Sequence, residues 1–243
     1  MSQFYDLKVV QKEELSPESV SVVLEIPENL KEKFKYRPGQ FVMLEKNIKG
    51  AQLRRYYSIY NAPGENQIKL GIKDKGGDGF ADYARHHLKV GEHLRVSVPM
   101  DDVPFDLSHD NKQSKKFLAL TIGSGITPFY SYIQYLIQQQ SPDKLILIYG
   151  NESPEKTMFY KALKTIEQQH PQNLKVYYVF SKNNSGDFTG RINPEIIKTI
   201  LQKEGTDFDG VYIIGPDDLK KTAAQVLIDS GIPTDRLHYR VYS

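Results

Sequence analysis

Hydrophobic and polar residues alternate with a period near two through the first 107 residues of the chain. The alternation is clearest in the segments 19–27, 67–74 and 93–99, and this period is typical of half-buried β-strands. Turns such as Pro63-Gly64 separate the segments, and one brief helical stretch falls at 80–88. Several short strands divided by turns predict a small antiparallel β-barrel.

The second half of the chain has a different pattern. Continuous apolar runs, expected to be strands, occupy 117–122, 145–149, 176–180, 211–214 and 236–242. Helices are expected between them, beginning at Thr127-Pro128, Ser153-Pro154, Asn193-Pro194 and Asp217, with the last ending at Gly231. Strands and helices in alternation predict a five-stranded, parallel, doubly wound α/β domain. The polar segment 106–116 separates the halves, which predicts domains at 1–107 and 113–243.

Composition narrows the function classes. The 32 basic and 30 acidic residues nearly cancel, so neither nucleic acid nor a membrane surface is expected as a partner. The N-terminal segment lacks the apolar block of a secretory signal, so a cytoplasmic location is expected. The absence of cysteine excludes disulfides, a catalytic thiol and cysteine-ligated iron–sulfur clusters. No metal site is expected at His86-His87, because neighbours on a helix diverge.

The ends of the apolar strands carry candidate ligand-binding residues, since ligands of open α/β sheets bind at the carboxyl edge. Gly123 and Gly125 follow the first strand in the motif G-S-G-I-T-P, where a backbone free of side chains can approach a phosphate. The alternative is a tight strand–helix turn. The next strands end at Gly150 to Ser153, at Ser181-Lys182 and at Gly215-Pro216.

The barrel half contains a second candidate site. The stretch LRRYYSIYNAP, residues 53–63, places arginines and tyrosines around Ser58. An aromatic-rich core strand is one interpretation, and a flat aromatic ligand with an anionic tail is the other. The glycine-rich turn at 76–79 is either a plain hairpin turn or, together with Arg55, a pyrophosphate cradle.

These motifs resemble those of the ferredoxin–NADP reductase family of flavoproteins over nearly the whole chain. The family's R-x-Y-S motif corresponds to residues 55–58, its P-G-Q-F strand to 38–41, its G-x-G-x-T-P motif to 123–128 and its Gly-Pro pair to 215–216. The resemblance implies FAD on the barrel and NADPH or NADH on the α/β domain. It also implies hydride transfer from nicotinamide to flavin, and delivery of electrons to flavodoxin or ferredoxin.

The resemblance also implies roles for individual residues. Tyr57 would stack on the isoalloxazine ring, Ser58 would hydrogen-bond near flavin N5, and Thr127 would shape the nicotinamide pocket; these three form the expected catalytic set. The residues expected to bind the cofactors are Arg55, Tyr57, Ser58, Ile72, Gly76, Gly77, Phe80, Ala81, Gly123, Gly125, Thr127, Pro128, Ser181, Lys182, Arg191, Gly215, Pro216 and Tyr242.

Several positions depart from the family pattern. Ala81 stands where a serine is frequent, Ile214 where a cysteine is frequent, and Arg240 where a carboxylate is common, with Tyr242 as the aromatic residue beside it. For coenzyme choice, Lys182 and Arg191 favour the 2′-phosphate of NADPH, whereas Glu152 favours the free ribose hydroxyl of NADH. Of the two, NADPH is the expected coenzyme.

Three other functions are compatible with the same residues. The chain could be the reductase component of an oxygenase or a reductase of free flavin. From a different class, it could be a non-catalytic cofactor-binding or electron-carrier subunit. Without cysteine it is not expected to carry its own iron–sulfur module.

Overall fold

The protein is described by a computed structural model, which covers residues 3–48, 50–77, 79–101, 105 and 114–241. The chain forms two compact units. One comprises Met1–Phe105 and Thr127–Tyr135, and the other Asp106–Ile126 and Leu136–Ser243. The domain limits predicted at 107 and 113 both fall outside the described residues, so they stay a prediction.

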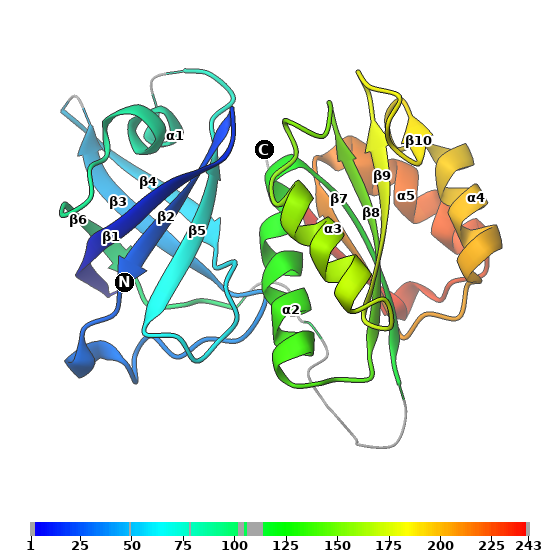
Figure 1. Cartoon of the computed structure of the whole chain (residues 1–243), viewed down its shortest axis with the longest axis horizontal. Coiled ribbons are helices and arrows are strands. Elements are labelled where there is room, and N and C mark those ends of the chain that lie inside the picture. The colour runs from blue at the N-terminus through cyan, green and yellow to red at the C-terminus, as the bar shows by residue number, and fades with distance from the viewer. Residues whose placement is uncertain (1–2, 49, 78, 102–104, 106–113, 242–243) are drawn as a thin grey trace. The chain divides into compact units, whose positions relative to one another are not determined.

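The first unit contains a curled antiparallel sheet of six strands (Figure 1), ordered β4-β3-β6-β1-β2-β5. The strands are β1 (Phe4–Ser16), β2 (Ser19–Glu25), β3 (Phe41–Ile48), β4 (Ala51–Ser58), β5 (Gln67–Lys73) and β6 (His93–Ser97). Just beyond β4, a bridge between Ile59 and Leu70 joins the two edge strands. The edges therefore meet, and the predicted antiparallel barrel is confirmed.

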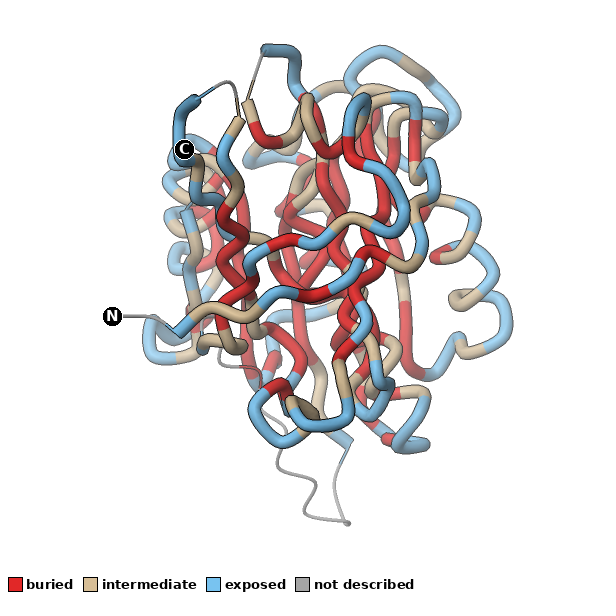
Figure 2. The backbone as a smooth tube through the Cα atoms, turned by 90° about the vertical axis from the view of Figure 1, so that its left-hand side faces the viewer, coloured by how far each residue is buried: buried red, intermediate tan, exposed pale blue. Residues whose placement is uncertain are grey.

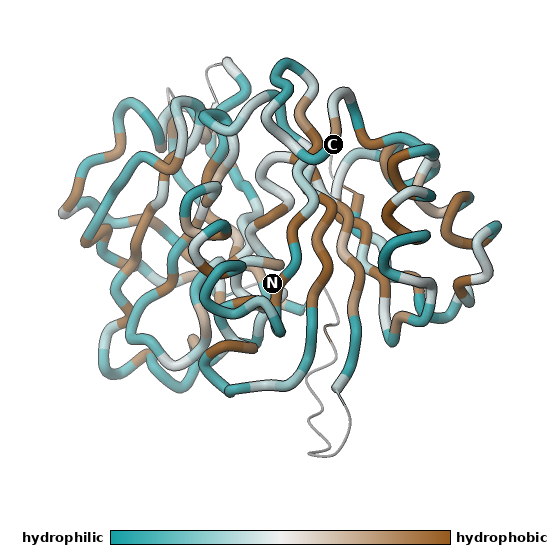
Figure 3. Tube along the Cα trace, turned by 45° about the vertical axis from the view of Figure 1, so that its right-hand side comes forward, coloured by the Kyte–Doolittle hydropathy of each residue, from teal (hydrophilic) through white to brown (hydrophobic). Residues whose placement is uncertain are grey.

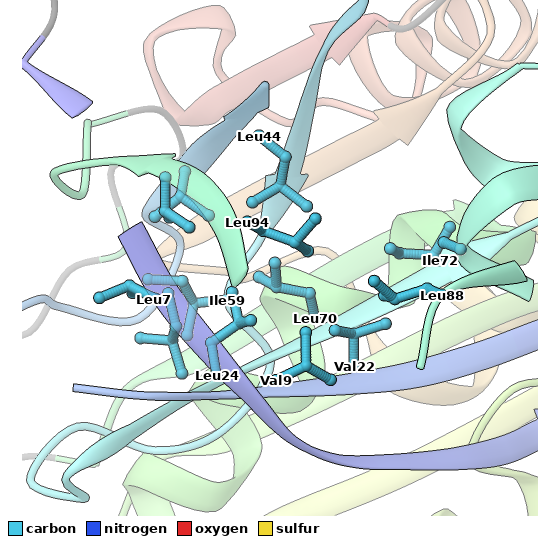
Figure 4. Packing of buried hydrophobic residues seen from close by; sticks show 14 of the residues in the cluster. Leu7, Val9, Val22, Leu24, Leu44, Ile59, Leu70, Ile72, Leu88 and Leu94 are labelled. Atoms are coloured by element: carbon cyan, nitrogen blue, oxygen red, sulfur yellow. The ribbon is translucent and has the colours of Figure 1, made fainter. Parts of the chain in front are cut away.

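The inward-facing residues of these strands form one apolar core (Figure 4). Its members include Leu7, Leu24, Leu44, Leu70 and Leu94, all fully buried. The predicted helical stretch is present as helix α1 (Phe80–Asp82) followed by a π-helical turn (Tyr83–His87), and a 3₁₀ turn lies at Glu28–Leu30. This short helix packs on the core through its first residue, which is 1% exposed.

The second unit contains a parallel sheet of six strands ordered β10-β9-β8-β7-β11-β12. The strands are β7 (Lys116–Ile122), β8 (Lys144–Asn151), β9 (Leu174–Phe180), β10 (Phe188–Thr189), β11 (Gly210–Gly215) and β12 (Leu237–Val241). The five predicted strands are all present. The sixth, β10, has only two residues, too few to produce a hydrophobic pattern in the sequence.

The helices of this half of the chain are α2 (Ile126–Gln138), α3 (Tyr160–Gln169), α4 (Pro194–Glu204) and α5 (Asp217–Asp229), with 3₁₀ turns at Gly123–Gly125 and Thr234–Arg236. Apolar side chains of α4 and α5 pack together with one face of the sheet, and α3 lies on the opposite face (Figure 1). Figure 2 shows that the buried residues follow the strands, and Figure 3 that the same segments are the most hydrophobic. No helix in the described part of the chain is long and apolar enough to cross a lipid bilayer.

Two of the four predicted helix starts are correct. Asn193 caps α4, where its side chain accepts a hydrogen bond of 3.0 Å from the backbone N–H of Ile196. Helix α5 begins at Asp217 as predicted, and Gly231, in a left-handed conformation with φ +87°, follows its end.

The other two predicted starts are wrong. Thr127 is not an N-cap, because the 3₁₀ turn at Gly123–Gly125 runs directly into α2 and places Thr127 inside the helix. Helix α3 begins at Tyr160 rather than at Ser153-Pro154. The reason is Phe159, whose left-handed φ of +61° cannot belong to a right-handed helix.

Candidate cofactor-binding sites

The motif at 55–58 lies at the end of edge strand β4. Because successive residues of a strand point to opposite faces, Arg55 and Tyr57 share one face while Arg54 and Tyr56 share the other. Tyr56 is 60% exposed and meets the ring of Phe41 edge-on, with 5.5 Å between centroids. Tyr57 is half-buried and packs against the core. The two tyrosines therefore have different surroundings.

The two arginines differ as well. The Nε of Arg54 donates a hydrogen bond of 2.6 Å to Glu45, and Arg95 lies 2.5 Å from the other oxygen of the same carboxylate. Glu45 is 2% exposed, and its pKa is lowered by the hydrogen bond from Arg54 and by the charge of Arg95. Arg55 is exposed, and among the described residues it donates only to the carbonyl oxygen of Arg54, at 2.8 Å, and makes no ion pair. Arg54 thus has a structural partner, and the Arg55 guanidinium has charge available for a ligand.

The ring of Tyr57 packs beside the start of α1. Its centroid is 5.8 Å from that of Phe80, and burial raises the pKa of the Tyr57 phenol, which stays neutral. Ser58 is buried, and so is Ile72 in the adjoining core, whereas Ala81 is half-buried on α1. Of this part of the predicted site, the aromatic face of Tyr57 is the element best suited to contact a flat ligand.

The glycine turn before α1 leaves its backbone open. Gly76 and Gly77 have φ of +89° and +130°, which disfavours other residues, and a Cβ on either would have no atom within 4 Å. Asp74 accepts a 2.9 Å hydrogen bond from the Gly76 amide and fixes the start of the turn. Such a turn can receive a bulky anionic group close to its backbone.

A possible cation site lies beside this turn. Ligand atoms of Asp74, Asp82 and His86 lie within 4.8 Å of one another. The Asp74 carboxylate is already 3.6 Å from the guanidinium of Arg85, which supplies positive charge. The cluster is satisfied within the protein, and we assign no metal to it.

In the second unit, the predicted strand-end residues gather at the carboxyl edge of the sheet, since β9, β8, β7 and β11 are neighbours in that order. Gly123 follows β7 in a left-handed conformation, with φ +53°. Gly215 ends β11 and is buried, and Pro216 is the residue before α5. Thr127 and Pro128, which belong to the first unit, lie buried in the first turn of α2.

Two predicted residues with opposite implications for the coenzyme are in direct contact. Lys182, after β9, is 2.9 Å from the carboxylate of Glu152, after β8, and Lys156 approaches the same oxygen at 3.1 Å. The hydrogen bond from Lys182, and after it the one from Lys156, lowers the pKa of Glu152 to about 2. Ser181 and Arg191 are exposed, and within the described residues Arg191 makes no ion pair.

One residue of this edge, Tyr149, was not predicted from the sequence, and another, Asn151, lies within the predicted strand end at Gly150 to Ser153. The hydroxyl of Tyr149 donates a hydrogen bond of 2.9 Å to the carbonyl oxygen of Gly123. Asn151, at the end of β8, has both side-chain polar atoms buried without a hydrogen-bond partner among the described residues. Tyr149 was predicted only as part of the apolar strand at 145–149. Its hydroxyl, on the residue directly before Gly150 at the strand end, was the signal that could have marked it as a site residue.

Comparisons with known proteins agree with this geometry. A model described as "Oxidoreductase FAD-binding domain" matches residues 6–105, and one described as "Oxidoreductase NAD-binding domain" matches residues 120–225. One component of the 1,2-phenylacetyl-CoA epoxidase of Escherichia coli (strain K12) is 31% identical over 98% of this chain and 67% of its own length. The chain belongs to the ferredoxin–NADP reductase-like family.

The chain is also similar to two proteins of lower sequence identity. A flavohemoprotein of Halalkalibacterium halodurans is 27% identical, and the match covers 96% of this chain but only 59% of that protein. The ferredoxin NADP⁺ reductase of Neisseria gonorrhoeae, solved with bound FAD and NADP, has the same fold, with a TM-score of 0.79, 20% identity and 99% of both chains covered. The predicted fold, family and cofactor classes are confirmed, and the protein is an oxidoreductase with FAD-binding and NAD(P)-binding domains.

The departures from the family pattern can now be placed in this reductase. Ile214 is buried in β11, and its register partner on β12 is Arg240. Arg240 is half-buried on β12, the edge strand of the sheet, so its replacement of the family's carboxylate and a solvated edge-strand arginine both stay predictions. Tyr242 lies outside the described residues.

Proposed function

We propose that this reductase passes electrons from NAD(P)H through FAD to a separate acceptor of the flavodoxin or ferredoxin type. The observation that carries the proposal is the arrangement around β4. Tyr57 and Arg55 share one strand face, the ring of Tyr57 packs against the first residue of α1, and the open turn at Gly76-Gly77 precedes that helix. A flat ring system joined to a pyrophosphate matches these groups.

The described residues fit FAD. The Arg55 guanidinium, without an ion pair among the described residues, would hold the pyrophosphate, and the backbone of Gly76 and Gly77 would receive it without steric conflict. Tyr57 would stack on the ring system, and Ser58 would donate a hydrogen bond to it. When bound, FAD supplies the chemistry that accepts an electron pair from NAD(P)H and releases electrons singly.

The second unit would bind the coenzyme. The turn at Gly123–Gly125 would receive the pyrophosphate of NAD(P)H, in the position where dinucleotides bind to doubly wound sheets. Ser181, Lys182 and Arg191 would contact the adenosine ribose or its 2′-phosphate. Gly215 and Pro216 would shape the nicotinamide pocket. The contribution of the protein is to orient the reacting rings and to exclude water.

A second candidate acceptor is an oxygenase. It is supported by the 31% identity to the epoxidase component, of which this chain spans 67%. The 243 residues contain no cysteine, so a cysteine-ligated iron–sulfur acceptor would have to be provided outside this sequence. In either case the same reductase chemistry would serve a separate partner.

The decisive experiment is the visible spectrum of the purified protein under anaerobic conditions. We expect flavin absorbance that survives gel filtration and is bleached on addition of NADPH or NADH. Flavin that binds only transiently and is turned over as substrate would instead identify a free-flavin reductase. A protein that stays colourless and inert with added FAD would contradict the proposal and favour a non-catalytic role. Cytochrome-coupled assays with added ferredoxin, flavodoxin or oxygenase would then identify the acceptor.

A further inference from the structure

The buried hydroxyl of Tyr149 lies between two backbone carbonyls. It is 2.9 Å from the carbonyl oxygen of Gly123 and 3.4 Å from that of Met158. A hydroxyl has a single proton to donate, so the shorter contact identifies Gly123 as the principal acceptor. Tyr149 itself is 0% exposed on β8, so its position is set by the core rather than by solvent.

This bond fixes the orientation of one peptide group in the Gly123–Gly125 turn. In a trans peptide the C=O and the following N–H point in opposite directions. Because the Gly123 carbonyl is held toward the buried Tyr149 hydroxyl, the N–H of Ser124 is directed the other way. The Gly123 carbonyl also accepts the backbone N–H of Ile126 at the start of α2, which ties the same peptide to the helix.

The residue that makes this bond is held tightly. Tyr149 pairs in register with Thr121, two residues before Gly123. At the next position, a Cβ on Gly150 would lie 3.0 Å from the side chain of Ile122, so the two strands are in close contact beside the turn. The hydroxyl therefore holds its place relative to the turn before any ligand arrives.

We propose that Tyr149 is a positioning residue that preorganises the Gly123–Gly125 backbone for the pyrophosphate of NAD(P)H. The inference rests on the proposed function, because it takes the Gly123–Gly125 turn to be the pyrophosphate site. It assigns a role to a residue outside the expected binding set. A turn ordered in advance loses less conformational freedom when it binds its ligand. Because both coenzymes contain the same pyrophosphate, the effect of Tyr149 should be equal for NADPH and NADH.

The test compares Tyr149→Phe with Tyr178→Phe. Tyr178 is the register partner of Tyr149 on β9, is 3% exposed, and its hydroxyl has no hydrogen-bond partner among the described residues. Both variants remove one buried hydroxyl from neighbouring strands. Only Tyr149→Phe removes a bond to the turn.

For Tyr149→Phe we expect the Kd of NADP⁺ and of NAD⁺, measured by calorimetry, and the KM of both reduced coenzymes to rise about fivefold, the factor for one hydrogen bond of about 1 kcal/mol. The rate of flavin reduction at saturating coenzyme and the FAD content should stay within about twofold of the unsubstituted protein. Tyr178→Phe should match that protein in every measurement. Unchanged Kd values in Tyr149→Phe, or an equal loss in Tyr178→Phe, would overturn the inference.

A second measurement does not depend on how the variant folds. In the unsubstituted protein without coenzyme, the amide of Ile126, which donates to the Gly123 carbonyl, should already exchange slowly with deuterium, and coenzyme should change this little. Fast exchange that slows only after NADP⁺ is added would show that the ligand orders the turn, and would overturn the inference. Failure of the proposed function is seen separately, as a protein that binds no FAD or is not reduced by NAD(P)H.

Discussion

The ammonium group of Lys182 lies 2.9 Å from the carboxylate of Glu152, and this contact joins two residues that suggest different coenzymes. Lysine at this position would attract a 2′-phosphate, and glutamate would accept a hydrogen bond from a ribose 2′-hydroxyl. With Lys156 at 3.1 Å from the same carboxylate, Glu152 partly neutralises both cations. We therefore expect the pair to set coenzyme preference jointly, because NADPH would have to compete with Glu152 for Lys182.

The first prediction is that Glu152→Gln shifts the protein toward NADPH. Removing the negative charge leaves Lys182 available to a 2′-phosphate and takes away a repulsive group. We expect the KM for NADPH to fall about threefold or more while the KM for NADH stays the same or rises, with a smaller difference at high salt because the groups are exposed. Steady-state kinetics with both coenzymes at two salt concentrations measure this.

A matched control is Asp207→Asn. Asp207 is another exposed carboxylate in an ion pair, with Arg236 at 3.4 Å, but it lies before β11 and so at the opposite edge of the sheet. It should leave both KM values unchanged. If Glu152→Gln leaves the ratio of the two KM values unaltered, Glu152 does not influence coenzyme choice.

The second prediction concerns the cations themselves. Replacing Lys182 and Arg191 together by alanine should raise the KM for NADPH about tenfold, because two charge-assisted contacts to the 2′-phosphate are lost. The KM for NADH should change little, since NADH lacks that phosphate. An equal rise for both coenzymes would reject the assignment of these residues to the 2′-phosphate, and no rise for either would remove them from the site.

The third prediction uses the two faces of β4. Tyr57→Ala should weaken FAD binding about tenfold, because an aromatic surface against a flat ligand is lost. Tyr56→Ala, on the opposite face and 60% exposed, should retain FAD. Flavin released on dilution or gel filtration measures both variants. Full retention of flavin by Tyr57→Ala would contradict the stacking assignment.

Much of the architecture could be predicted from the sequence because it follows from periodicity. The alternation in 67–74 and the continuous apolar run at 145–149 correspond to β5 and β8. Helix starts were less predictable. Ser153-Pro154 has the composition of a helix start, yet Thr157 hydrogen-bonds back to Ser153 and Pro154, and the left-handed Phe159 delays the helix to residue 160.

Some features of the candidate site could also be predicted from the sequence and others could not. The glycine turns were visible in the sequence because only their backbone chemistry matters. The pairing of Glu152 with Lys182 was not visible, because the two residues are 30 positions apart in the sequence. They meet because the strands that precede them are neighbours in the sheet, and the sequence does not show the order of the strands. The contact between Glu45 on β3 and Arg54 on β4 was not visible for the same reason. This contact shows that Arg54 has a structural partner and so distinguishes it from Arg55.

The last prediction follows from Glu45, whose carboxylate is 2% exposed, accepts a hydrogen bond from Arg54 and forms an ion pair with Arg95. These partners hold its pKa in the folded protein below the ordinary value of about 4.3 that it has when unfolded. The stabilisation is therefore fully present above about pH 4.3 and is lost as the pH falls through the lower folded pKa. Glu45→Gln should lower the free energy of unfolding by about 2 kcal/mol at pH 7, because two arginines lose their counterion.

As the pH falls below the folded pKa, Glu45 becomes protonated and the difference between the two proteins should shrink. Urea unfolding at pH 7 and at successively lower pH measures it. Glu28→Gln is the control, because Glu28 pairs with Lys31 on the surface at 86% exposure and should contribute less than about 1 kcal/mol at either pH. A loss in Glu45→Gln that is constant across this range would show that the side chain acts by packing rather than by its charge.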